Sequence, residues 1–334
     1  MARFSVQYHD QKHSLGGCSL NLRILRYVVR PEGFLPFTGA AILIGFTVTL
    51  WEVGIHGAEW GLFVIAFIAA SLVHIDAHIW NDCMDIEVDR LEKSAETGRE
   101  RPLVSGWATV SDYRRMSAVV TLVVVILAAY LTVYRIYMPF LFLIGFLFDY
   151  GYNHPRIALG HRPFTEWYVF PWLVVGVTVT IVYAAANIFS LLAFILSLVQ
   201  GMTVTCFGVS MMRRDVNSDR KGRKFTSSVK YPSVPHSTIY GTGTMLVIVM
   251  MVYPLIAILG DVFLAYLLVL ISAAFAVVNT VLGAEIDQLC TRALYSVFPD
   301  FEARANRLML QQVGASMVHA VAIAAVILIY GDIL

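Results

Sequence analysis

Two short segments of the sequence carry oxygen ligands at a spacing that suits metal binding. The first contains Asn81, Asp85 and Asp89, and the second contains Asp215 and Asp219. Side chains four residues apart share one face of a helix, so each set would present its oxygens in one direction. Grouped carboxylates repel one another unless cations lie between them, and hard oxygen ligands favour Mg²⁺. The predicted metal ligands are Asn81, Asp82, Asp85, Asp89, Asp215 and Asp219.

A magnesium ion bound in this way keeps some of its waters and shares its shell with substrate phosphates. Arginine and lysine side chains flank both segments and would bind the same phosphates. The chemistry that this set favours is ionisation of an allylic diphosphate, in which charge on the departing diphosphate is stabilised by metal and basic groups. The predicted catalytic residues are Asp85, Asp89, Asp215 and Asp219. A solvated loop of mixed charge is the alternative, but two matching sets at two helix ends disfavour it.

The elements that carry these segments are long apolar runs. Of 334 residues, 58% are hydrophobic and only 14% are charged, whereas an ordinary soluble domain has about 25% charged residues. Runs of about 20 apolar residues are long enough to cross a bilayer. The sequence predicts an all-α polytopic membrane protein with nine transmembrane helices, at residues 34–54, 60–80, 115–134, 136–150, 166–186, 188–210, 239–259, 261–283 and 311–331.

The basic residues divide unevenly between the two sides of this topology. Of the 24 lysines and arginines, all but Arg135 fall in the amino-terminal segment or in the loops after the second, fourth, sixth and eighth spans. Cytoplasmic loops are enriched in lysine and arginine. The amino terminus and both carboxylate segments are therefore expected on the cytoplasmic side, with the active site opening there.

The chain is expected to form one domain over residues 1–334, with residues 1–30 as a cytoplasmic segment. The second and sixth spans both run into an aspartate-rich basic loop, which indicates two related halves facing one cavity. A net charge of +1 argues against nucleic acid as a partner. The four cysteines are far apart in the sequence and suggest neither a zinc site nor a disulfide framework.

The motifs resemble those of the UbiA superfamily of intramembrane prenyltransferases. Asn81-Asp-x-x-Asp85-x-x-x-Asp89, followed by Arg101-Pro102, looks like the first signature of that family, and Asp215-x-x-x-Asp219 with Lys224 resembles the second. Tyr152-Asn153-His154-Pro155-Arg156 is similar to a short tyrosine motif, and Arg30-Pro31 matches the pair before the first helix. The loop before Arg101 has extra residues, from Ser94 to Arg99.

The resemblance covers residues 27–285 and implies nine helices around a central cavity, two Mg²⁺ ions and an isoprenyl diphosphate donor. It implies that Asn81, Asp85 and Asp89 face Asp215 and Asp219 across the metals. Contacts to the diphosphate are implied for Arg30, Arg101, Tyr152 and Lys224. The implied reaction transfers a prenyl group to a lipophilic acceptor in the membrane, most often an aromatic one.

Other polar residues lie at membrane depth, where ionisable groups usually have a function. His74, Asp76 and His78 precede the first motif, and they either form a buried polar network or bind or deprotonate the acceptor. Asp149 ends the fourth span, where pairing with an arginine is one expectation and catalysis is another. Asp287, together with Glu285, is expected in the loop after the eighth span, solvated or in an ion pair.

Two other functions remain open at this stage. A terpene cyclase on the same scaffold would use a double bond of the donor itself as the nucleophile. A transporter would place ionisable residues at mid-membrane on several helices and would open outward, whereas these charges gather at one end. The sequence does not indicate the prenyl chain length, the acceptor, the catalytic base or the oligomeric state.

Overall fold

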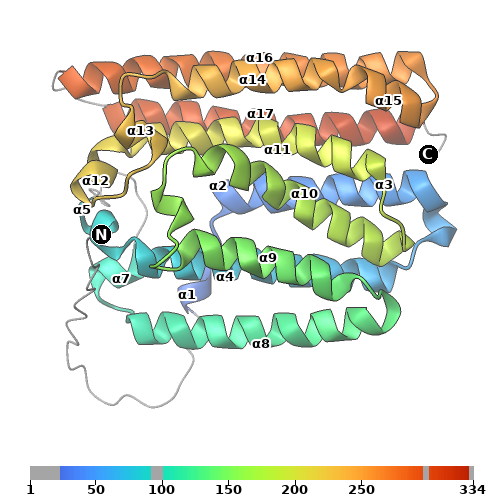
Figure 1. Ribbon diagram of the computed structural model, residues 1–334, viewed down its shortest axis with the longest axis horizontal. Helices are drawn as coiled ribbons and strands as arrows, with labels where there is room; N and C mark the ends of the chain where they lie inside the picture. Colours follow the sequence, from blue (N-terminus) through green and yellow to red (C-terminus); the bar gives the residue numbers. More distant parts are fainter. Residues whose placement is uncertain (1–22, 92–100, 296–300, 331–334) are drawn as a thin grey trace.

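The computed structural model describes residues 23–91, 101–295 and 301–330, and within them the regular structure is helical. The extra loop residues Ser94 to Arg99 and most of the predicted segment 1–30 lie outside the described residues. Long helices run roughly parallel to one another as a bundle (Figure 1). They are α3 (Ala40–Gly57), α4 (Trp60–Met84), α8 (Val110–Tyr134), α9 (Met138–Asn153), α10 (Thr165–Ala186), α11 (Leu191–Arg214), α14 (His236–Met250), α16 (Val262–Tyr295) and α17 (Phe301–Tyr330).

Eight helical stretches in the described part of the chain are long and apolar enough to cross a bilayer. The remaining long helix of the bundle, α9, corresponds to the predicted fourth span. It has only 16 residues and is not among these eight. The seventh span divides at Met251 into α14 and α15 (Val252–Leu259), and Pro254 lies in the first turn of α15. The nine expected spans therefore match the bundle closely, and the fold class is confirmed.

Two helices are longer than the hydropathy pattern indicates. α16 continues past residue 283 to Tyr295, and α17 begins at Phe301. Asp287 consequently lies inside α16, so its predicted place in a loop is wrong. Asp287 is buried and forms an ion pair with Arg213 of α11, with Arg213 Nε 2.9 Å from Asp287 Oδ1. Of the two expectations for this residue, solvation or an ion pair, the structure shows the ion pair.

The first span starts with a change of helix type. Arg30 precedes α2 (Pro31–Phe34), which continues through the π-helical turn η1 (Leu35–Gly39) into α3. Pro36 lies within this turn and has no backbone N–H to donate. A π-helical turn shifts the side chains that follow relative to a regular α-helix. Thr38 belongs to this turn, is buried, and its hydroxyl lies 2.5 Å from Nδ1 of His74 on α4.

One end of the bundle gathers the short helices (Figure 1, left). The short helices at this end are α1 (Arg23–Val28), α5 (Ile86–Leu91), α7 (Pro102–Ser105), α12 (Val216–Lys221) and α13 (Ser227–Lys230). α5 follows α4, and α12 follows α11. The two carboxylate segments therefore lie at the same end of the molecule.

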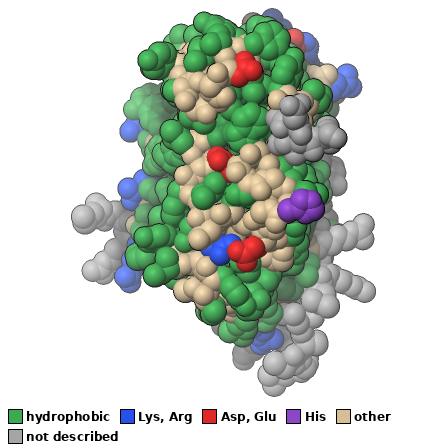
Figure 2. All heavy atoms as spheres, turned by 90° about the vertical axis from the view of Figure 1, so that its right-hand side faces the viewer, with side chains coloured by type: hydrophobic (Ala, Val, Ile, Leu, Met, Phe, Trp, Pro, Cys, Tyr) green, Lys and Arg blue, Asp and Glu red, His purple; other side chains and the backbone are tan. Residues whose placement is uncertain are grey.

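The opposite end is largely hydrophobic or uncharged, and Figure 2 shows Lys or Arg side chains at one place in its middle. Arg135 connects α8 to α9 at this end and is 5% exposed. Its guanidinium donates to the carbonyls of Tyr183 and Ala184, at 3.1 and 2.9 Å, and lies 2.5 Å from a carboxylate oxygen of Glu59. The cation thus binds the last carbonyls of α10, where positive charge stabilises a helix end.

Candidate functional site

Each carboxylate segment includes a bend where a membrane-spanning helix ends. Asp85 follows α4 with φ/ψ of −92°/9°, and Asp215 follows α11 with −84°/7°. The hydrogen bonds nevertheless continue through each bend, since Asp85 N donates to Asn81 O at 2.9 Å and Asp89 N to Asp85 O at 2.7 Å. Because these helical hydrogen bonds continue, the side chains of each set, which are four residues apart in the sequence, stay on one face, as the spacing predicts.

The two short helices that follow these bends pack directly against each other. α5 contacts α12, and a Cβ built at Gly222 would lie 2.6 Å from Val88 Cγ2. Only glycine permits this approach, because the site has no room for a side chain. The absence of a side chain at residue 222 thus brings the Asp85–Asp89 segment next to the Asp215–Asp219 segment.

Asp85 lies between two basic groups from distant parts of the chain. Lys224 Nζ is 2.6 Å from Oδ2, and His161 Nε2, from the short helix η2 (Leu159–His161), is 2.8 Å from Oδ1. Burial alone would raise the pKa of Asp85, but Lys224 and His161 outweigh it and hold the pKa below its usual range. Burial would lower the pKa of Lys224, but the charges of Asp85 and Asp219 raise it above its usual range. Both groups are therefore ionised, and their charges offset each other.

Asp89 has the opposite balance. Arg101 Nη1 lies 2.5 Å from its Oδ1, yet burial raises the pKa of Asp89 to about 7, against the lowering effect of Arg101. The neighbouring charges of Asp85 and Asp82 raise the pKa further. Near neutral pH this carboxyl group is therefore divided between its protonated and ionised forms.

Asp82 lies apart from the other predicted ligands. Its carboxylate forms a buried ion pair with Arg30 and accepts a hydrogen bond from the Tyr113 hydroxyl at 3.5 Å. It does not line the cavity that Asn81, Asp85 and Asp89 line. One residue of a helix corresponds to a rotation of about 100°, so Asp82 points away from the neighbours that share the i, i+4 face.

The second segment is also paired with basic and hydroxyl groups. The Arg214 guanidinium binds both oxygens of Asp215, at 2.5 and 2.8 Å, and donates to Asn306 of α17 at 2.8 Å. Asp219 is 2% exposed and accepts from the Thr226 hydroxyl at 3.5 Å. Each predicted aspartate ligand thus has a hydrogen-bond donor or a cation beside it.

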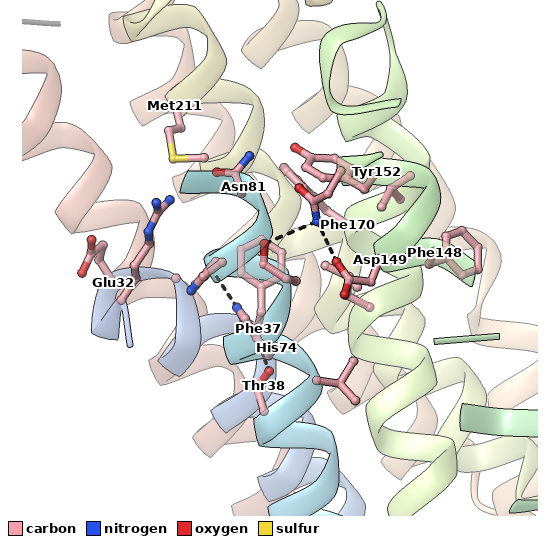
Figure 3. Close-up of a pocket in the computed structure, with 18 of the residues that line it drawn as sticks. Glu32, Phe37, Thr38, His74, Asn81, Phe148, Asp149, Tyr152, Phe170 and Met211 are labelled. Carbon is pink, nitrogen blue, oxygen red and sulfur yellow. Dashed lines mark hydrogen bonds between the residues drawn. The ribbon is translucent and has the colours of Figure 1, made fainter. Parts of the chain in front are cut away.

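A cavity of about 910 Å³ opens beside these carboxylates and extends between the helices. In Figure 3, His74 and Asn81 come from α4, and Asp149 and Tyr152 come from α9 on the other side. Seven of the predicted site residues with charged side chains line it, and so do Asn81 and Tyr152; the seven are Arg30, Asp85, Asp89, Arg101, Asp215, Asp219 and Lys224. Away from them the wall is apolar and aromatic, and its aromatic residues are Phe37, Phe142, Phe148, Phe170, Trp172, Phe194 and Phe207.

The donor set fits Mg²⁺ shared with a phosphate. The described residues contain no group of three His, Cys, Asp or Glu residues close enough to hold a metal ion. Mg²⁺ does not need such a cage, because it binds one or two carboxylates and completes its shell with water and substrate phosphates. The Nε of Arg30 is buried without a hydrogen-bond partner in the described structure, which leaves a donor available for such an anion.

Three residues at this site were not predicted as site residues from the sequence. His161 and Asn306 reach the carboxylates from η2 and α17, and Arg214 binds Asp215 from the preceding position. A histidine between Arg156 and Arg162 in a basic loop was the only available signal for His161. Nothing in the local sequence indicates Asn306, since its contact with Arg214 joins residues 92 positions apart.

Comparisons with known proteins place the sequence and the fold in one family. The UbiA prenyltransferase family matches residues 40–298. A digeranylgeranylglyceryl phosphate synthase of Sulfurisphaera tokodaii is 30% identical over 96 residues, which is 28% of this chain and 33% of that protein. This chain thus spans about a third of the length of that curated relative.

Solved structures share the fold over nearly the whole chain. A UbiA homologue from Archaeoglobus fulgidus bound to GPP and Mg²⁺ has a TM-score of 0.56 at 14% identity, covering 91% of this chain and all of that one. A second structure of it, bound to DMAPP and Mg²⁺, has a TM-score of 0.57 at 14% identity and covers 91% and 99%. An apo UbiA homologue from Aeropyrum pernix K1 has a TM-score of 0.56 at 15% identity and covers 92% and 100%.

Proposed function

The chain belongs to the UbiA prenyltransferase family, and from this membership we propose that it transfers a prenyl group from an isoprenyl diphosphate to a lipophilic acceptor inside the membrane. The observation that carries the proposal is that one cavity among the described residues joins a charged mouth to an apolar interior. A diphosphate needs the first part, and an isoprenyl chain needs the second. The acceptor class that we propose is aromatic, and a glyceryl lipid is the competing class.

Asn81, Asp85, Asp89, Asp215 and Asp219 are the residues proposed to hold Mg²⁺. Asp82 was expected among them, but its ion pair with Arg30 and its place outside the cavity favour a positioning role. The structures of the Archaeoglobus relative with Mg²⁺ and GPP or DMAPP support the choice of metal and donor. When bound, Mg²⁺ supplies positive charge to the diphosphate oxygens and so assists departure of the diphosphate.

Basic residues around the mouth would bind the diphosphate directly. Arg30 and Arg101 line the cavity from the starts of α2 and α7, and Lys224 lies between Asp85 and Asp219. Their charges would stabilise the negative charge that collects on the leaving diphosphate as the C1–O bond breaks. Tyr152 is the fourth proposed contact, and its ring lines the cavity near Phe170, with centroids 6.1 Å apart.

The apolar part of the cavity would then protect the allylic cation. Its aromatic walls exclude water and offer ring faces to positive charge. An acceptor atom held next to C1 supplies the electron pair of the new bond, and the acceptor releases one proton. Proximity of the two substrates accounts for much of the rate of such a step.

The orientation of the protein in the membrane is also a proposal. The end that carries α5, α7, α12 and α13 bears most of the lysines and arginines in the described part of the chain, whereas the opposite end has Arg135. Positive loops face the cytoplasm. The charged mouth would therefore open to the cytoplasmic side, where soluble diphosphates are found.

Product analysis tests the proposal. The purified full-length chain in lipid nanodiscs is incubated with Mg²⁺ and prenyl diphosphates of several lengths, including GPP and DMAPP. Parallel samples receive no acceptor, a phenolic acceptor such as 4-hydroxybenzoate, a glyceryl phosphate ether, or a lipid extract. We expect a prenylated acceptor and release of diphosphate, with slow hydrolysis of the donor when the acceptor is omitted.

The Asp219→Asn variant is the matched negative sample, since it changes one proposed metal ligand. If a cyclic terpene forms at multiple turnovers without an acceptor, the transferase proposal is wrong and the protein is a terpene cyclase. Absence of any reaction with all donors, in a protein that still binds them with Mg²⁺, would contradict both.

A further inference from the structure

A chain of three hydrogen-bonding side chains lines the cavity beyond the carboxylates. His78 and His74 lie one and two turns before Asn81 on the same face of α4, and Thr38 reaches them from the π-helical turn η1. Since a helix rises 1.5 Å per residue, His74 lies roughly 10 Å along α4 from Asn81. His74 therefore lies deeper in the cavity than the carboxylates proposed to hold the diphosphate end of a donor.

The direction of each hydrogen bond follows from one fixed end. His78 Nδ1 lies 2.8 Å from the carbonyl of Val28, and a carbonyl only accepts, so this nitrogen carries a hydrogen. In a neutral imidazole the other nitrogen is then an acceptor. His78 Nε2 therefore accepts from His74 Nε2, which is 3.2 Å away.

The same logic continues to the threonine. With its hydrogen on Nε2, neutral His74 has a lone pair on Nδ1, and the Thr38 hydroxyl lies 2.5 Å from it. The hydroxyl must donate to this nitrogen. Its oxygen keeps two lone pairs, and Thr38 lines the cavity. The three side chains are thus ordered so that a proton can be taken from the cavity and passed toward His78.

The surrounding structure holds the chain in place. The His74 and His78 rings pack edge to face with centroids 4.6 Å apart, and Phe34 lies against His74 at 5.5 Å. Thr38 is on a π-helical turn, a feature that is frequent at functional sites. A purely structural pair of histidines would not need to line the cavity, whereas both of these do.

Prenyl transfer requires such an acceptor of protons. When the C1–O bond of the donor breaks, its electron pair leaves with the diphosphate, and the new bond uses an electron pair of the acceptor. Each turnover therefore releases one proton from the acceptor. The carboxylates at the mouth are paired with Lys224, Arg101 and Arg214, and they would hold Mg²⁺ when the metal and the donor are bound. The proton acceptor is therefore to be sought elsewhere in the cavity.

Asp149 is the other candidate in the cavity, and its contacts indicate a different role. Asn153 Nδ2 donates to Asp149 Oδ1 at 2.6 Å and to the carbonyl of Ala77 at 3.3 Å, so this pair joins α9 to α4 (Figure 3). The Asn153 Oδ1 is buried and has no hydrogen-bond partner among the described residues. It is an acceptor that a hydroxyl group of a bound molecule can satisfy.

We propose that Thr38, His74 and His78 form the proton-acceptor chain of the transfer, and that the acceptor substrate carries a hydroxyl group whose proton they take. This proposal rests on the proposed prenyl transfer. The hydroxyl proton passes to His74 Nδ1, either directly or through Thr38, and the hydrogen on His74 Nε2 moves to His78 Nε2. The positive charge then lies on His78, roughly 6 Å nearer the carboxylate end. A phenol and an aliphatic alcohol share this chemistry.

The test separates proton removal from ionisation of the donor. His74→Gln keeps a polar side chain but cannot relay a proton, and His319→Gln is its matched control, because His319 is buried on α17, bonds Ser272 and does not line the cavity. Thr38→Val is compared with Thr47→Val, whose hydroxyl donates to Leu43 O within the same span. Single-turnover mixing with GPP, Mg²⁺ and the phenol or alcohol acceptor measures diphosphate, prenylated acceptor and prenyl alcohol separately.

We expect His74→Gln to lower formation of the prenylated acceptor about a hundredfold, while GPP binding and diphosphate release stay within about threefold of the unchanged protein. Prenyl alcohol should increase, since water captures the cation instead. With a series of phenols the loss should shrink as the phenol becomes more acidic. The His319→Gln and Thr47→Val proteins should behave like the unchanged one, and the phenol and alcohol arms identify which hydroxyl source the site accepts.

Several results would overturn the proposal. His74→Gln could form product at the normal rate, or could lose GPP binding and diphosphate release together with product, which would indicate a role in folding or ionisation. Asp149→Asn could alone produce the expected pattern, which would assign proton removal to that carboxylate. If the unchanged protein releases diphosphate yet prenylates no acceptor, the proposed function itself fails, and this result is distinct from the three results above.

Discussion

Asp85 and Asp215 occupy equivalent bends in the two halves of the bundle, each with nearly the same backbone angles at the junction between a membrane-spanning helix and a short helix. At both positions the next aspartate, Asp89 or Asp219, donates its N–H to the carbonyl of the first. The two halves therefore use one local geometry to turn carboxylates toward a shared cavity. The shared geometry is what the similar ends of the second and sixth spans predict for two related halves.

The close contact between the short helices should be essential for activity. Gly222→Ala would place a methyl group 2.6 Å from Val88 Cγ2 and 3.0 Å from Val88 Cα, so α12 must move away from α5. We expect kcat/KM to fall about tenfold or more, because displacements near 1 Å at a reacting site have effects of this size. Gly243→Ala is the control, since nothing lies within 4 Å of its added Cβ. Equal activity of the two variants would contradict the role given to residue 222.

Loss of the two central carboxylates should have different consequences for folding. Asp219→Asn should abolish turnover with little loss of stability. Asp85→Asn also abolishes turnover, but it leaves the buried Lys224 without its closest anion and should lower the free energy of unfolding by about 3 kcal/mol. Thermal unfolding in detergent and a turnover assay measure both quantities. Removal of Mg²⁺ by a chelator should stop turnover reversibly, and full activity in excess chelator would contradict the metal assignment.

The expected loss of stability in Asp85→Asn differs from what the sequence alone suggests. Clustered carboxylates without a metal should repel one another, so removing either Asp85 or Asp219 would leave folding near normal. In the structure the repulsion is offset by Lys224, Arg101, Arg30 and Arg214. Long-range partners of this kind are set by packing between helices, and spacing along one helix carries no information about them.

The spacing of residues along the sequence was enough to predict other features of the site. The i, i+4 spacing correctly placed Asn81, Asp85 and Asp89 on the cavity, because hydrogen bonding continues through the bend. The same reasoning could not separate Asp82 from them, since the rotation of α4 about its axis depends on its neighbours. The prediction for Asp287 was wrong because α16 continues beyond its apolar stretch. Hydropathy indicates the end of a helix there, but the ion pair between Asp287 and Arg213 stabilises the additional turns.

Affinity for Mg²⁺ should depend on pH through Asp89. Burial raises the pKa of this carboxyl to about 7, and a metal binds only the ionised form, so binding must displace a proton at lower pH. The dissociation constant of Mg²⁺ should therefore increase about tenfold between pH 8 and pH 6. Titration of the protein with Mg²⁺ and a non-hydrolysable diphosphate donor measures it.

Two variants check the origin of this dependence. Asp89→Asn should weaken binding and flatten the pH profile. Glu87→Gln should leave the profile unchanged, because Glu87 is an exposed carboxylate of the same short helix that pairs with Arg90. A profile that keeps its slope in Asp89→Asn would assign the proton to another group.

The uneven distribution of charge predicts which residues each side of the membrane can reach. In a variant without Cys18, Cys83, Cys206 and Cys290, a cysteine replacing the exposed Lys221 should react with an impermeant thiol reagent only from the cytoplasmic side. A cysteine replacing His56, exposed at the opposite end, should react only from outside. Labelling of both positions from one side would mean that the orientation or the number of spans between them is wrong.

The position of Asp82 predicts a role in placing Arg30 instead of binding metal. Asp82→Asn removes the buried anion beside Arg30, so the guanidinium loses its fixed orientation toward the cavity. We expect KM for the diphosphate donor to rise about tenfold, by loss of one charge-assisted contact, while the dissociation constant of Mg²⁺ does not increase, because removing the charge of Asp82 lowers the pKa of Asp89. Asp89→Asn provides the contrast, because it should raise the dissociation constant of Mg²⁺, and Glu87→Gln should alter neither quantity. A large loss of Mg²⁺ affinity in Asp82→Asn would return this residue to the metal ligands.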